Sequence, residues 1–133
     1  MSAMRDAIVL TLQADAGLIA LVDNRIYANQ PPEGSAYPLV MVSAQTPPTP
    51  ERVFQQVGFE RAVYLVRGCS ISTSPAEVDD INAAIRAALD GATLTITGKT
   101  ERGIYWQGDY ETHEFYNEQT YQYAGGLYEV MAE

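Results

Sequence analysis

Apolar residues recur at helical spacing in two segments near the start of the chain. Residues 3–13 form the first segment, and Ser2 stands where a helix cap is expected. Residues 16–22 repeat the pattern behind Asp15, whose short carboxylate is a good N-cap. The pattern therefore predicts two consecutive helices, or one helix with a break at Asp15.

The strongest helix signal lies in residues 74–89. Ser74, Pro75 and Glu77 occupy the N-cap, N1 and N3 positions of a capping box. Apolar residues then recur every three or four positions until Gly91, which stands where a helix commonly ends in a left-handed glycine. This segment is predicted to be a capped amphipathic helix.

Alternating apolar and polar residues, many of them β-branched or aromatic, predict strands around these helices. The adjacent glycines Gly125 and Gly126 indicate a bulge or the close approach of another backbone. The predicted strands are residues 25–28, 38–44, 59–71, 92–97, 101–116 and 119–131.

Helices and strands in this order predict an α+β fold, with a mostly antiparallel sheet and two main helices packed on one face. Residues 29–35 are a loop rich in proline and glycine. Residues 46–50 hold three prolines, so they are predicted to stay out of the sheet as an extended, solvated excursion. With no internal repeat or linker, residues 1–133 are expected to form a single domain.

Composition narrows the function classes. The chain has a formal charge of −9, from 17 acidic and 8 basic residues, which argues against broad neutralisation of a nucleic-acid backbone. Residues 101–133 carry seven of the acids and one base, a net of −6, together with six of the nine tyrosines. No apolar run approaches the roughly 20 residues that span a bilayer, and no signal peptide is recognisable. We therefore expect that the protein does not associate with a membrane. We also expect that it is made in, and stays in, a reducing cytoplasm.

Catalytic and cofactor motifs are missing from the sequence. It has no nucleophile elbow, phosphate loop or dinucleotide fingerprint, so we predict a protein that is not an enzyme and has no cofactor. A dyad of Cys69 and His113 is formally possible, but nothing around Cys69 would activate its thiol. Asp109, Glu111 and His113 alternate along one predicted strand and are weak metal candidates. Successive side chains on one strand face lie about 6.6 Å apart, so a solvated acidic face is the favoured interpretation.

Aromatic residues crowd the last two predicted strands. Alternation places Trp106 and Tyr110 on one face and Tyr105 on the other. Part of this set can fill an ordinary core, and a monomer with a well-filled sheet is the alternative. A sheet that is apolar on both faces, with few helices to cover it, favours a protein partner on the second face.

Several stretches resemble one protein family. They are residues 12–27 (LQADAGLIALVDNRIY), 31–34 (PPEG) and 37–42 (YPLVMV), followed by a helix at 77–89 and a strand at 94–96. In order and spacing the chain resembles the tail terminator or tail-to-head joining proteins of long-tailed bacteriophages, which are small tail-completion proteins. The resemblance covers nearly the whole chain, and only the acidic, tyrosine-rich C-terminal third departs from the pattern.

The resemblance implies a structural protein of a phage, a prophage or a phage-like particle. Such proteins look like subunits of a hexameric ring that caps the tail tube, joins it to the head connector or neck protein, and lets DNA pass without specific binding. The expected location is the head-proximal end of the virion tail, after assembly in the host cytoplasm. An acidic lining suits such a channel because it repels DNA.

We predict interface residues on two parts of the chain. Trp106 and Tyr110 would be anchors, and Arg52, Phe54 and Phe59, around the proline-rich excursion, would contact a neighbouring subunit or the tube. Three alternatives remain open. They are another neck or head-completion protein, an acidic DNA mimic that inhibits a nucleic-acid enzyme, and a small metal-dependent enzyme.

Overall fold

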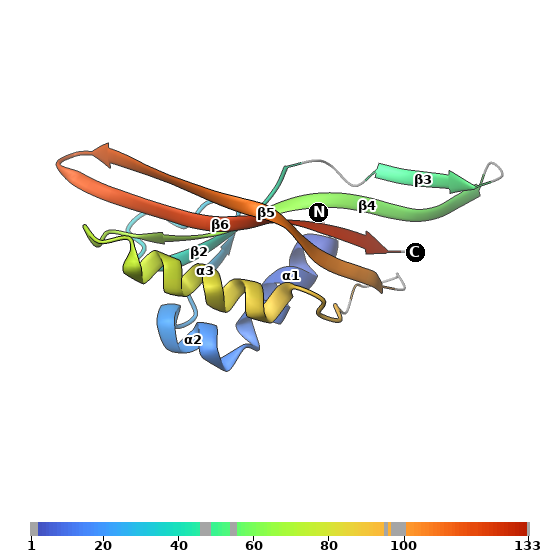
Figure 1. Ribbon diagram of the computed structural model, residues 1–133, viewed down its shortest axis with the longest axis horizontal. Coiled ribbons are helices and arrows are strands. Elements are labelled where there is room, and N and C mark those ends of the chain that lie inside the picture. Colours follow the sequence, from blue (N-terminus) through green and yellow to red (C-terminus); the bar gives the residue numbers. More distant parts are fainter. Residues whose placement is uncertain (1–2, 46–48, 54–55, 95, 97–100, 133) are drawn as a thin grey trace.

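The computed structural model describes residues 3–45, 49–53, 56–94, 96 and 101–132, and side chains within the ranges 49–60 and 101–102 are left out of the description. These residues form one long, twisted sheet with the helices gathered beneath it (Figure 1). No helix in the described ranges is long and apolar enough to cross a membrane. The elements are α1 (Ala3–Gln13), α2 (Ala16–Val22), β1 (Ile26–Ala28), β2 (Leu39–Ala44), β3 (Thr49–Val53), β4 (Gln56–Ser70), α3 (Ala76–Leu89), β5 (Glu101–Tyr116) and β6 (Gln119–Ala132).

The sheet has the strand order β1-β2-β4-β6-β5, and β3 pairs with the first part of β4. Only β1 and β2 are parallel in the described sheet; the other neighbours are antiparallel. The predicted α+β class and mostly antiparallel sheet are therefore confirmed. All three described helices lie on the same face, so α2 joins the two main helices that the sequence predicted there (Figure 1).

The core lies between the helices and that face of the sheet. Alternation along β4 and β6 points one set of side chains into it, and α3 contributes one apolar stripe. Tyr64 and Tyr128 are opposite each other in the ladder and are the largest fully buried side chains. Around them lie Ile8, Leu12, Leu18, Ile81, Ile85, Leu89 and Ile104, all fully buried.

The capping box of α3 forms only in part. The Ser74 hydroxyl oxygen accepts a hydrogen bond from the Ala76 N–H at 3.2 Å. Glu77, however, does not bond back to the cap. Its carboxylate accepts a 2.5 Å hydrogen bond from the hydroxyl of Ser70, a fully buried residue at the end of β4. A tertiary partner has replaced the local one, and it ties the first turn of α3 to the sheet.

Two predictions about strands are wrong. Thr49 and Pro50 of the proline-rich segment pair with Arg61 and Glu60, although they were expected to stay outside the sheet. This is possible because β3 lies at an edge of β4, where a residue without an N–H group is tolerated. The predicted strand at 92–97 is not a strand in its described residues, but Leu94 and Ile96 are buried, as their alternation predicted.

β5 and β6 form a long hairpin with a two-residue turn. Asn117 and Glu118 both have positive φ, 50° and 62°, which is the conformation of a type I′ turn. Its twist matches that of the flanking strands, so the register of the hairpin is fixed at its tip.

Candidate interaction surface

The aromatic side chains of the hairpin divide between its two faces. A register irregularity between Trp106 and Gly108 inserts Gln107 as an extra residue in β5. Trp106 consequently lies opposite the buried Tyr128, whereas Tyr110 lies opposite Gly125. The prediction that Trp106 and Tyr110 share a face is wrong, because a β-bulge reverses the alternation between them.

Trp106 lies on the face that the helices cover. The Arg86 guanidinium of α3 stacks over the Trp106 ring, 3.8 Å from the ring centroid. The Trp106 backbone N–H donates a hydrogen bond to Asp90 Oδ1 at 3.0 Å. Gly126 makes room for this ring, since a Cβ atom there would lie 3.1 Å from Trp106 Cδ1. Trp106 is thus partly buried against the core and held from two sides by the C-terminal turns of α3.

Tyr110 lies on the opposite, open face of the sheet, in one row with Gly125 and Arg67. The guanidinium of Arg67 lies 5.8 Å from the ring centroid of Tyr110 and 4.8 Å from that of Tyr123. A Cβ atom on Gly125 would lie 2.3 Å from the Val66 carbonyl oxygen. Gly125 therefore permits the strands to approach and leaves the space over which Arg67 reaches the tyrosines.

A second, smaller apolar cluster covers part of the open face. Leu39, Met41 and Cys69 are its buried members, and partly buried tyrosines pack against them. Burial raises the pKa of Cys69 to about 11, so the thiol stays protonated at neutral pH. Around the cluster lies a hollow of about 260 Å³ lined by Asn29, Gln30, Pro31, Tyr37, Leu39, Met41, Arg67, Cys69 and Tyr123.

Cys69 and His113 do not form a dyad. Cys69 belongs to the open face, opposite Tyr123 in the ladder. His113 pairs with Gln122, one position further along, so its side chain projects from the other face. A raised thiol pKa and this separation leave Cys69 as a buried apolar side chain.

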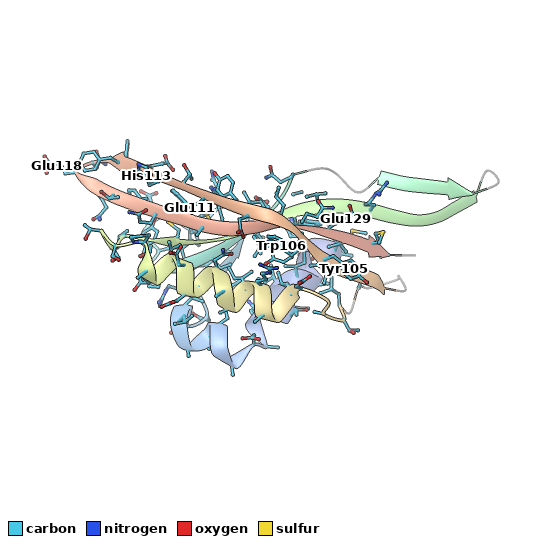
Figure 2. All side chains as sticks on the ribbon, in the orientation of Figure 1. Tyr105, Trp106, Glu111, His113, Glu118 and Glu129 are labelled. Carbon is cyan, nitrogen blue, oxygen red and sulfur yellow. The ribbon has the colours of Figure 1, made fainter. Side chains whose placement is uncertain are left out.

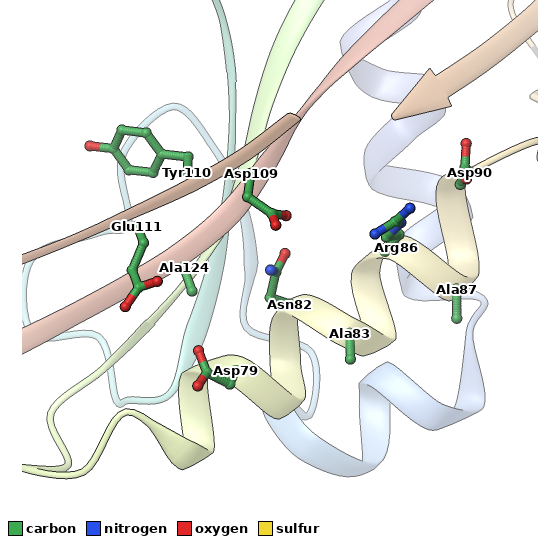
Figure 3. A pocket seen from close by; sticks show the side chains of 10 residues that line it. All are labelled: Asp79, Asn82, Ala83, Arg86, Ala87, Asp90, Asp109, Tyr110, Glu111 and Ala124. Atoms are coloured by element: carbon green, nitrogen blue, oxygen red, sulfur yellow. The ribbon is translucent and has the colours of Figure 1, made fainter. Parts of the chain in front are cut away.

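A cleft of about 670 Å³ separates β5 from α3. Asp109 and Glu111 point from β5 toward the helix, whereas Tyr110 between them points away (Figure 3). Asp79 of α3 and Asp90, which directly follows the helix, add two further carboxylates, and Arg86 is the basic residue of the lining. The cleft is therefore acidic, with a mixture of polar walls and alanine side chains. Its lining residues are Asp79, Asn82, Ala83, Arg86, Ala87, Asp90, Asp109, Tyr110, Glu111 and Ala124.

Asp109, Glu111 and His113 project from the same side of β5, as alternation predicted. Figure 2 shows Glu111 and His113 along the strand and Glu118 at the far tip of the hairpin. Among the described residues, no group of three or more His, Cys, Asp or Glu side chains could hold a metal ion. Asp109, Glu111 and His113 therefore form an acidic strand face.

The tip of the hairpin carries exposed aromatic rings. Phe115 is 73% exposed and Tyr116 is 67% exposed, and both precede the turn. The other predicted contact residues lie at the opposite end of the sheet, where β3 and β4 extend beyond the helices (Figure 1). Arg52 pairs with Val57 and Phe59 with Glu51 in that ladder, while Phe54 lies outside the described residues.

Sequence reasoning missed both stacked arginines. Arg86 was one polar residue in the exposed face of a helix, and Arg67 was one polar residue in an apolar strand. The signal that could have indicated the stacking is a single basic residue close to aromatic residues. Which residues are close depends on the order of the strands, so the fold must be known first.

Solved structures show the same architecture elsewhere. A chain in the structure titled "Virion of native gene transfer agent (GTA) particle" aligns with a TM-score of 0.74 and 18% identity. The alignment covers 98% of this chain and 94% of the other, so the whole fold is shared. A comparison with curated proteins finds no match.

The family follows from the sequence itself. The model of the family described as "Tail completion protein gp17" matches residues 6–122, which is most of the chain. The protein belongs to this family of structural phage tail-completion proteins, as its resemblance predicted. The matched region begins within α1, includes α2, α3 and all of β5, and ends a few residues into β6.

Proposed function

We propose that this protein is the tail terminator of a phage, a prophage or a phage-like particle, and that it works as a ring, with six subunits the expected number. The ring would cap the tail tube, stop its growth and bind the head-connector or neck protein at the head-proximal end of the virion tail. The observation that carries the proposal is the family match over residues 6–122. Assembly would take place in the host cytoplasm.

The long sheet supports a subunit that contacts neighbours at two ends. β3 and β4 extend beyond the helices at one end, and the β5–β6 hairpin extends at the other (Figure 1). Contact between two different surfaces of identical subunits is heterologous, and such contacts generate rings when the rotation closes. Arg52, Phe54 and Phe59 are the proposed contacts at the first end.

Trp106 and Tyr110 remain proposed anchors, but in different ways. Tyr110 offers its ring on the open face and is partly accessible. Trp106 packs on the core, so its contribution to assembly would come through the shape of β5 and the position of Arg86. The acidic residues of 101–133 would face the channel or a basic partner, and DNA would pass without specific binding.

Light scattering and negative-stain imaging of the purified protein, alone and with its tail-tube protein, test the proposal. We expect rings, and tubes of defined length when the protein is added to polymerising tube subunits. A strict monomer in both conditions would contradict the ring. Rings that bind connectors but leave tube length uncontrolled would favour the neck or head-completion alternative.

Tyr110→Ala tests the anchor assignment on the open face. Leu10→Ala is the matched control, because Leu10 is a large apolar residue that is 63% exposed on α1. We expect Tyr110→Ala to shift the assembly midpoint to a several-fold higher protein concentration, with little change for Leu10→Ala. Equal effects of the two substitutions would show that Tyr110 is not an anchor.

A further inference from the structure

The outer edge of β5 has an open section. β5 is the last strand of the sheet and pairs only with β6 in the described sheet. In a hairpin with a two-residue turn, the residues that flank the turn exchange both backbone hydrogen bonds. Tyr116 and Gln119 flank the turn, so alternate residues back from Tyr116 direct their N–H and C=O groups toward β6. The residues between them, Asp109, Glu111, His113 and Phe115, direct theirs outward.

The first part of the same edge is already covered. The Gly91 N–H donates to the Ile104 carbonyl oxygen at 2.9 Å, and the Trp106 N–H donates to Asp90 Oδ1 at 3.0 Å. Both partners come from the end of α3. Beyond the bulge at Gln107, no segment in the described ranges pairs with the outward groups, and a row of unpaired donors and acceptors remains.

The acidic cleft lies beside this row. Asp109 and Glu111 point toward α3, and Asp79 faces them from the helix (Figure 3). A strand added to the edge of β5 would lie about 4.8 Å from it, next to the cleft that β5 and α3 line. Alternate side chains of that strand would then point into the cleft, among its carboxylates.

We propose that residues 109–115 form a strand-addition site for an extended segment of another protein, with lysine or arginine at alternate positions. Backbone pairing would give affinity, and the acidic cleft would select the basic side chains. The open row spans six residue steps, or about 20 Å, so a segment of roughly seven residues would fill it. Another protein is favoured over a second copy because this chain has only 8 basic residues against 17 acidic ones. The site requires neither ring closure nor tube capping.

Amide hydrogen exchange in the full-length protein tests the site, with a peptide that alternates lysine and threonine as the probe. In the free protein, the outward amides of Glu111 and His113 should exchange at least tenfold faster than the β6-bonded amides of Tyr110 and Thr112. Addition of the peptide should slow the outward amides at least tenfold. A peptide with glutamate in place of lysine is the charge control, and one with the lysines clustered is the pattern control.

Two variants separate backbone pairing from charge. Glu111→Pro removes an outward N–H at an edge position where proline is tolerated, and should weaken peptide binding at least tenfold. Slow exchange of the Thr112 amide verifies that the hairpin is intact. Asp109→Asn with Glu111→Gln keeps both N–H groups and should weaken binding while flattening its salt dependence.

Three results would overturn the proposal. The first is no binding of the lysine peptide, and the second is binding without protection of the outward amides. The third is protection of those amides in the absence of peptide at concentrations where the protein self-associates, because a second copy would then occupy the edge. None of these results bears on whether the protein caps a tail tube.

Discussion

Gly125→Ala should destabilise the fold strongly for so small a change. The added Cβ atom would lie 2.3 Å from the Val66 carbonyl oxygen and 2.5 Å from Arg67 Cα, and both of these are backbone atoms. Side chains can rotate away from a clash, but here two strands would have to separate. Extra atoms forced into a well-packed site typically cost about 1–3 kcal/mol.

Gly108→Ala is the matched control. Gly108 lies in the neighbouring strand, and a Cβ atom there would have no heavy atom within 4 Å. The same substitution without a clash stabilises by about 0.4–1 kcal/mol, because alanine has less freedom than glycine in the unfolded chain. The two variants should therefore differ by about 1.4–4 kcal/mol in free energy of unfolding.

Urea titration followed by circular dichroism measures this difference, and thermal melts should show a gap of about 4–16 °C in Tm. Both variants must be compared at one protein concentration, since self-association stabilises the folded state. Equal stability of Gly125→Ala and Gly108→Ala would refute the inference that β4 and β6 approach each other through the missing side chain. Loss of the Arg67 stacking on Tyr110 and Tyr123 should accompany the destabilisation.

Three further substitutions have defined outcomes. Ser70→Ala should lower the free energy of unfolding by about 1–2 kcal/mol in urea titrations, because it leaves the Glu77 carboxylate without its hydroxyl donor; an unchanged midpoint would show that the bond is not stabilising. Glu118→Gly should raise the melting temperature, because a left-handed backbone (φ 62°) costs a non-glycine residue about 1–2 kcal/mol, whereas the extra freedom of glycine in the unfolded chain costs only about 0.5–1 kcal/mol; a lower Tm would contradict the type I′ turn. Stability should fall as pH rises from about 9 toward 11, because the unfolded Cys69 thiol loses its proton while the folded one, with its raised pKa, keeps it. Cys69→Ala should make that slope shallower by up to about 1.4 kcal/mol per pH unit, and identical slopes would show that Cys69 does not contribute.

The sequence was sufficient where a signal is local. Apolar spacing and caps located the helices, and alternation located the long strands within a few residues of their observed bounds. Asp15 caps α2 as expected, with its carboxylate accepting from the Leu18 N–H at 2.9 Å. The pair Gly125 and Gly126 was predicted to permit a close approach, and β4 does approach β6 there.

What the sequence could not supply depends on which strands are neighbours. Pro50 argues against a strand unless an edge position is known to exist. Glu77 looked like a local cap residue until β4 brought Ser70 beside it. Arg67 acquires its aromatic partners from two other strands, so no spacing along the chain reveals them.

The bulge at Gln107 determines which changes in the length of β5 the hairpin can absorb. Side chains alternate strictly, so a one-residue change in length reverses the face of every residue on one side of it. The turn at Asn117 and Glu118 fixes the register from the tip back to the bulge, so the residues of β5 before the bulge would be the ones that change face. Deletion of Gln107 itself is the exception, because it removes the bulge: Trp106 would then directly precede Gly108 and stay opposite Tyr128, on the core. Among relatives, the loss of one residue in this part of β5 should therefore go together with a regular strand that lacks the bulge.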